Sequence, residues 1–181
     1  ELLKVRGLLS LAAGFRYEDG PGFNYEITPR ASALIIVPET DIGLRLSYGK
    51  GIRAAARDEL YHPVAGNENL KPERSKNYEA GLKFPIFNQR LWAEATFFIL
   101  QLENLIDKDY NHIPALFSNI GKAEIRGAEL ELQFTITNEL SGNVGYTRLL
   151  TEDKETGEHL PLRPNYKWIA DLMYKPSDRL T

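Results

Sequence analysis

The residues that could do chemistry in this sequence are few and lie far apart. The three histidines, His62, His112 and His159, each fall in a stretch expected to be a loop, and none lies at metal-ligand spacing from another. Cysteine is absent, which removes disulfides, thiolate zinc sites and cysteine nucleophiles. Because no nucleophile is paired with a base, we predict neither an enzyme nor a bound cofactor or metal.

Carboxylates cluster in two places without the spacing of a site. One expected loop holds acids at 152, 153, 155 and 158 around Lys154, and this spacing does not fit an EF-hand, so we interpret it as a solvated loop tip. Glu94, Glu129 and Glu131 are brought together by strand geometry alone, and we do not predict them to act as acid and base. The run 49–51 (Gly-Lys-Gly) is not expected to open a helix, so it is not predicted to cradle a phosphate.

Four basic side chains are the candidates for ligand contact. They flank one long expected loop, where they would form a cationic entrance that attracts anionic ligands. They are Arg53, Arg57, Lys71 and Arg74. The whole chain is not basic, because 22 Lys and Arg stand against 25 Asp and Glu in its 181 residues. We therefore predict no nucleic-acid partner.

The elements that must position these residues are strands, because the hydrophobic pattern has a period of two. From 129 to 137 the chain reads Glu-Leu-Glu-Leu-Gln-Phe-Thr-Ile-Thr, which places every apolar residue on one face of a strand. Similar alternation predicts about eight antiparallel strands, many of them longer than globular strands usually are. They cover 3–17, 29–37, 42–49, 77–84, 91–100, 129–137, 140–146 and 167–175.

The expected connections alternate in length along the chain. Short turns at 37–41, 85–90, 137–139 and 176–179 alternate with longer connections at 19–27, 52–76, 107–119 and 152–165. Short turns at one end and long loops at the other are typical of an outer-membrane barrel. A soluble barrel or sandwich remains the alternative, because alternation defines two faces but not which one meets water. Charged polar faces and aromatic residues near the strand ends favour the membrane.

Four segments in order carry a family resemblance. They read GNENLKPERSKNYEAGL at 66–82, SYGKGIRA at 47–54 followed by DELY at 58–61, NIGKAEIRGAELE at 119–131 and LPLRPNYK at 160–167. Together they resemble the β-barrel of TonB-dependent outer-membrane receptors. Each segment also has a structural interpretation, in which it holds the wall and the loop ends rather than touching ligand.

The resemblance implies a fold, a location and partners. It implies an all-β, antiparallel, up-and-down transmembrane barrel wall spanning 1–181, with about eight strands of a larger barrel of 22 strands. Such receptors lie in the outer membrane of Gram-negative bacteria and import siderophores, cobalamin or similar bulky nutrients, driven by TonB acting on a plug domain. We expect the plug and the last strands to lie outside these residues, and the full-length receptor to be a monomer in contact with outer-membrane lipid.

A second hypothesis has the strands closing on themselves as a small outer-membrane barrel. Eight strands are enough for side chains to fill the interior of a barrel. Such a barrel would act as a binding or structural module and would not carry out active transport.

Overall fold

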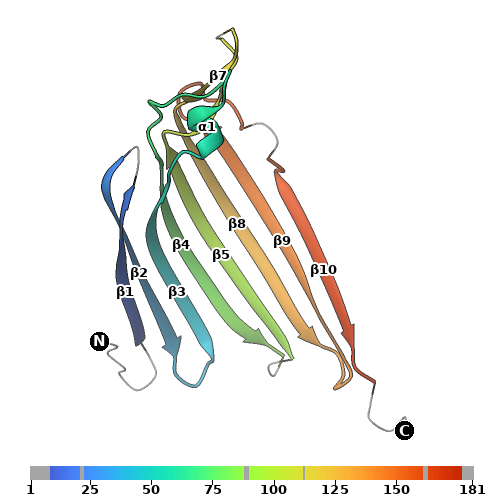
Figure 1. Ribbon diagram of the computed structural model, residues 1–181. Coiled ribbons are helices and arrows are strands. Elements are labelled where there is room, and N and C mark those ends of the chain that lie inside the picture. Colours follow the sequence, from blue (N-terminus) through green and yellow to red (C-terminus); the bar gives the residue numbers. More distant parts are fainter. Residues whose placement is uncertain (1–8, 21–22, 88–89, 112, 161–162, 177–181) are drawn as a thin grey trace.

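The computed structural model is a single curved sheet with loops gathered at one end (Figure 1). It describes the chain except for residues 1–8, 21–22, 88–89, 112, 161–162 and 177–181. The sheet has eight strands in the order β1-β2-β3-β4-β5-β8-β9-β10, and every neighbouring pair is antiparallel. Its strands are β1 (Leu9–Gly20), β2 (Phe23–Val37), β3 (Ile42–Arg53), β4 (Glu73–Ile86), β5 (Leu91–Glu103), β8 (Lys122–Thr135), β9 (Leu140–Asp153) and β10 (Tyr166–Tyr174).

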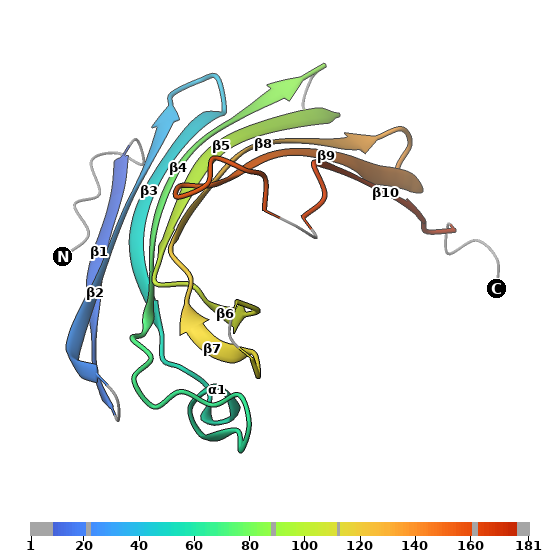
Figure 2. The same ribbon diagram turned by 90° about the horizontal axis from the view of Figure 1, so that it is seen from above.

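The described part of the sheet is an open arc. Seen from above, the strands curve around a hollow, and β1 and β10 lie at its two free ends (Figure 2). In the described residues β1 pairs only with β2, and β10 only with β9. The hypothesis of a small barrel closed on itself is therefore not what the structure shows.

Alternation in the sequence becomes two distinct faces of the arc. The helix and the small hairpin lie on the concave side (Figure 2), and Arg53 and Glu73, which contact them, therefore face inward. Register carries this assignment to the other strands, because opposite residues point the same way. The convex face is apolar over most of its area, and it leaves Leu46, Phe97 and Trp168 43%, 64% and 66% exposed. No helix among the described residues is long and apolar enough to cross a membrane.

The strands extend further than the pattern predicts at the loop end. The predicted long connection at 19–27 is wrong, because β1 and β2 stay paired to Glu18 opposite Glu26. The Tyr17 and Tyr25 rings stack there with centroids 5.9 Å apart. The expected loop at 52–76 is shortened by both of its flanking strands, and the start of the first predicted strand, at 3–8, lies outside the described residues.

Two elements inside the long connections are not predicted from the pattern. Helix α1 (Arg57–Tyr61) lies between β3 and β4, and a two-stranded sheet of β6 (Ile106–Asp109) and β7 (Leu116–Asn119) lies between β5 and β8. Both are too short to show a hydrophobic period. They meet above the hollow of the arc (Figures 1 and 2).

Candidate functional site

The loop ends of β3, β4, β5 and β8 form one ordered cluster. We call it the loop cluster and define it as residues 53–74 and 103–121. Its interior is small, with Leu70 and Ala65 only 4% and 6% exposed. Side-chain hydrogen bonds connect its parts.

Arg53 connects the sheet to α1. Its guanidinium donates to both oxygens of Glu73, with Nε to Oε2 at 2.6 Å and Nη2 to Oε1 at 2.7 Å. Nη1 also donates to Glu59 on α1, at 3.1 and 3.0 Å. Glu59 Oε2 in turn accepts from the Ala56 amide at 2.6 Å, so one carboxylate caps the helix and anchors it.

Glu73 also connects β4 to the hairpin, since its Oε1 accepts from the Ile106 amide at 2.9 Å. It is the first residue of β4, at the loop end of the strand. Burial alone raises the pKa of Glu73, but the hydrogen bonds from Arg53 and from the Ile106 amide outweigh it, and the pKa falls below its usual value.

Two asparagines tie the two loops to each other. Asn119 Oδ1 accepts from the Lys71 amide at 2.8 Å, and its Nδ2 donates to the carbonyls of Lys71 and Asn104 at 2.9 and 2.8 Å. Asn67 Nδ2 donates to the Phe117 carbonyl at 2.8 Å. Asn119 and Lys71 are 48 residues apart along the chain, and Asn67 and Phe117 are 50 apart, so no local pattern could have indicated these two contacts.

His62 ends α1 and turns the chain back. Its Nδ1 accepts from the amides of Val64 and Ala65 at 3.2 and 3.1 Å. Gly66 lies so close that an added Cβ would come within 2.5 Å of the His62 backbone nitrogen, which leaves room only for glycine. The expectation that the GNENLKPE segment holds the loop agrees with this geometry.

The structure separates the four predicted ligand-contact residues. Arg53 is occupied by two carboxylates, and Arg74 lies on the opposite face of β4 from Glu73, where its Nε donates to Glu26 of β2 at 3.0 Å. Arg57 and Lys71 are exposed in the loop cluster. A role in ligand contact stays a prediction for all four.

The other histidines and acids are placed as follows. His159 Nδ1 lies 2.9 Å from the Thr151 carbonyl, so that nitrogen carries the proton. His112 lies outside the described residues. Where the chain is described, no three His, Cys, Asp or Glu side chains are grouped so that they could hold a metal ion. In the expected acidic loop, hydrogen bonding to Glu152 raises the pKa of Lys154.

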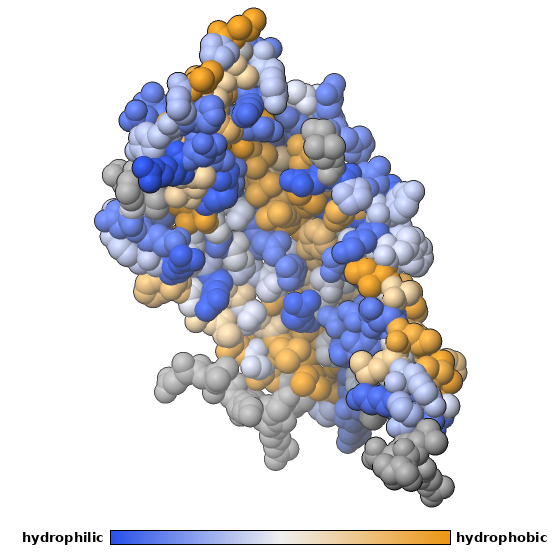
Figure 3. Space-filling model, turned by 45° about the vertical axis from the view of Figure 1, so that its right-hand side comes forward, coloured by the Kyte–Doolittle hydropathy of each residue, from blue (hydrophilic) through white to orange (hydrophobic). Residues whose placement is uncertain are grey.

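The concave wall below the loops is lined by charged groups in the middle of the strands. Arg45 reaches Glu79 and Glu94, with nitrogen–oxygen distances of 3.6 Å to each. Glu94 lies opposite Glu131 on β8. Figure 3 shows the molecule obliquely, with the loop end largely hydrophilic and apolar residues below it.

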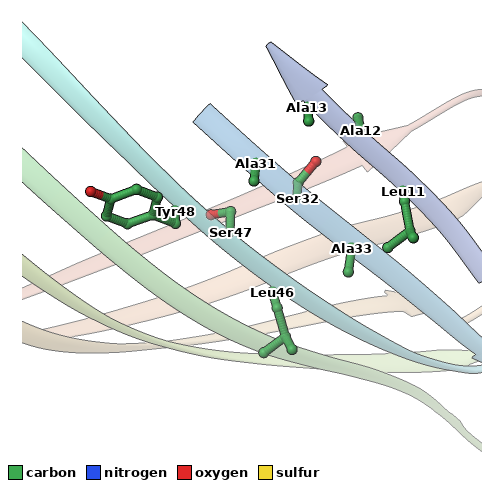
Figure 4. A pocket seen from close by; sticks show the side chains of 9 residues that line it. All are labelled: Leu11, Ala12, Ala13, Ala31, Ser32, Ala33, Leu46, Ser47 and Tyr48. Carbon is green, nitrogen blue, oxygen red and sulfur yellow. The ribbon is translucent and has the colours of Figure 1, made fainter. Parts of the chain in front are cut away.

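A hollow of about 550 Å³ on the first three strands lies away from this cluster. It is lined by small and apolar residues, and Figure 4 shows Leu11, Ala33 and Leu46 pointing to one side while the Ser32 hydroxyl points to the other. It has no charged lining residue, and its polar side chains are those of Ser32, Ser47 and Tyr48.

The comparison with protein families decides what this wall is. The family model described as TonB dependent receptor-like, beta-barrel, matches residues 3–181. The chain belongs to the TonB-dependent receptor β-barrel family. The sheet is therefore a transmembrane β-barrel wall, and the predicted fold class is confirmed.

Relatives within the TonB-dependent receptor family include transporters and siderophore receptors. The chain is 29% identical over 175 residues to the vitamin B12 transporter BtuB of Vibrio cholerae, covering 93% of the chain and 27% of that protein. It is 34% identical over 144 residues to BtuB of Photobacterium profundum, covering 74% of the chain and 23% of that protein. A probable TonB-dependent siderophore receptor, PiuA of Acinetobacter baumannii, is 28% identical over 109 residues, covering 60% of the chain and 14% of that protein.

Solved structures share the fold of this receptor wall. The siderophore receptor PirA of Pseudomonas aeruginosa superposes with a TM-score of 0.81 at 21% identity, over 97% of the chain and 36% of that structure. The copper transporter OprC superposes with a TM-score of 0.76 at 18% identity, over 96% of the chain and 32% of that structure. The chain thus spans about a quarter of the vitamin B12 transporters and about a third of the two solved structures.

Proposed function

We propose that this chain is part of the barrel of an outer-membrane active transporter that imports cobalamin or a ligand of similar bulk. The observation that carries the proposal is the match to vitamin B12 transporters along 93% of the chain. An ordered loop cluster at one end of the wall suits ligand capture outside the cell, because loops carried on a rigid scaffold can present binding groups. TonB would act on a plug domain supplied by residues outside this stretch.

A ferric siderophore is the second candidate substrate. The match to the siderophore receptor PiuA favours it. The exposed cations Arg57 and Lys71 suit an anionic ligand better than an uncharged one. Among the described residues of the wall, no group of side chains favours one of the two substrates over the other.

Uptake by the full-length receptor tests the proposal and separates the two substrates. We expect cells producing it to accumulate labelled cyanocobalamin only when TonB is present. Accumulation of a ferric siderophore instead would select the second candidate. Uptake that is unchanged without TonB would overturn active transport.

A matched pair of variants tests the predicted ligand contacts. With an anionic ferric siderophore, Arg57→Gln combined with Lys71→Gln should weaken binding and reduce its salt dependence. Arg30→Gln combined with Lys167→Gln, which alters exposed cations of β2 and β10 instead, should leave both unchanged. Equal behaviour of the two variants would remove Arg57 and Lys71 from the ligand site.

A further inference from the structure

The pairing of β2 with β3 stops before either strand ends. At the loop end its last pair is Arg30 opposite Gly49. Beyond that pair β2 reaches back to Phe23, and β3 continues to Arg53. Pro29, the next residue of β2 toward the loop end, has no amide hydrogen and cannot donate to a ladder. The two strands therefore separate at the loop end of the wall, as Figure 1 shows.

The end of the β1–β2 hairpin beyond this point is held together internally. We call residues 15–20 and 23–29 the outer hairpin. Its two strands stay paired along its length, with one irregularity near the end. The stacked rings of Tyr17 and Tyr25 add a side-chain contact between them. The outer hairpin can therefore move as one unit without losing its own pairing.

The opposite border of the separation is fixed in the wall. β3 stays paired with β4 up to Arg53 opposite Glu73, and β4 stays paired with β5 up to Arg74 opposite Glu103. A hollow of about 260 Å³ lies between this border and the outer hairpin, with lining residues from β2, β3, β4 and β5. We call it the side hollow. One of its borders is thus built into the sheet, and the other is attached to the sheet only through β1 and the lower part of β2 among the described strands.

An ion pair crosses the side hollow. Arg74 Nε donates to Glu26 Oε1 of the outer hairpin at 3.0 Å, and Arg74 Nη2 contacts the same oxygen. Both residues line the side hollow. Their side chains are 45% and 23% exposed, so water and salt weaken the attraction without removing it. A contact of this strength can hold a segment in place and still open.

We propose that the ion pair between Arg74 and Glu26 is a latch, which holds the outer hairpin against the wall and, when released, lets it swing outward about the last β2–β3 pair. The backbone hydrogen bonds that would otherwise fix the hairpin end at that pair. The outer hairpin lies at one end of the arc (Figure 2), so its position changes the width of the rim at the loop end. Only the link between that width and ligand entry rests on the proposed function.

Pulsed electron paramagnetic resonance on the full-length receptor in detergent measures the position of the outer hairpin. The chain has no cysteine, so spin labels attach at Asp19→Cys in the outer hairpin and at Lys122→Cys at the start of β8. Both residues are exposed. In this labelled receptor, Glu26→Gln and Arg74→Gln should each raise the population with the altered distance, relative to the latched one, by roughly two- to fivefold.

The matched control variant is Arg16→Gln. It removes the ion pair between Arg16 and Glu18, which lies within the outer hairpin and does not cross the side hollow. Its distance distribution should equal that of the unaltered labelled receptor. A shift as large as that of Glu26→Gln would overturn the proposal, because the loss of any charge in the hairpin would then suffice.

Two further measurements keep the outcome specific. Exchanging the charges, with Glu26→Arg and Arg74→Glu together, should restore the latched distance. If these variants do not assemble, the unaltered labelled receptor in about 1 M NaCl, where charges are screened beyond about 3 Å, should show the same shift as Glu26→Gln. A distribution that neither substitution nor salt changes overturns the latch. No ligand takes part in the measurement, so failure of the transport proposal, seen in uptake, is recognised separately.

Discussion

Asn119→Ala should release the β6–β7 hairpin from the loop that carries α1. The side chain makes three hydrogen bonds to backbone groups of Lys71 and Asn104. A net contribution near 1 kcal/mol for each bond, reduced because water reaches this half-buried side chain, leaves about 2 kcal/mol. Local opening should therefore become roughly 30-fold more frequent, while the paired strands of the wall stay intact.

Hydrogen exchange on the full-length receptor in detergent measures this opening. Peptides containing the amides of Lys71 and Ile106 should exchange faster in the variant, and peptides from the middle of β4 and β5 should not. Asn111→Ala is the matched control, because Asn111 is an exposed asparagine in the connection between β6 and β7. Unchanged exchange at Lys71 in Asn119→Ala would refute the reasoning, since the amide would then not depend on that side chain.

Two other perturbations test the packing and the electrostatics of the wall. Gly127→Ala should destabilise the full-length receptor by about 1–3 kcal/mol in denaturant unfolding, because the added Cβ would lie 2.2 Å from the Phe98 ring. In a Phe98→Ala background the cost should largely disappear, and an equal cost in both backgrounds would contradict the contact. The pKa of Glu73 is lowered in the folded state. Its contribution to folding stability is therefore complete above the ordinary carboxyl pKa, and it is lost as the pH falls through the lowered pKa. Proteolysis at α1 should therefore increase at acidic pH, and Glu73→Gln should show that increase already at neutral pH; a variant resistant at neutral pH would argue against the role of Arg53 and Glu73.

Much of the wall could be predicted because strand alternation is a local property. The predicted strand at 129–137 corresponds to β8, although β8 ends at Thr135 and begins at Lys122. Phe98 interrupts the polar side of its strand in the sequence, and the structure shows the reason: its ring lies over Gly127 of the neighbouring strand. An interruption of this kind is explained only by a cross-strand partner.

The candidate site could be predicted far less completely. Lys71 and Asn119 both fall in the segments that resemble the receptor family, yet nothing in either segment indicates that they bind each other. Arg53 was predicted from charge alone as a ligand contact, but two carboxylates from different elements engage it. The sequence does not show which residues neutralise a charged side chain, because those residues become its neighbours only when the chain folds.

The sequence by itself determined the all-β class, the two faces of each strand and the alternation of short turns with long connections. These follow from the pleat of a strand, whose period of two is visible in any short stretch. Only the tertiary structure decided the register between strands and the joining of two loops above the hollow. Each of these depends on hydrogen bonds between residues tens of positions apart, so each exists only once the strands have paired.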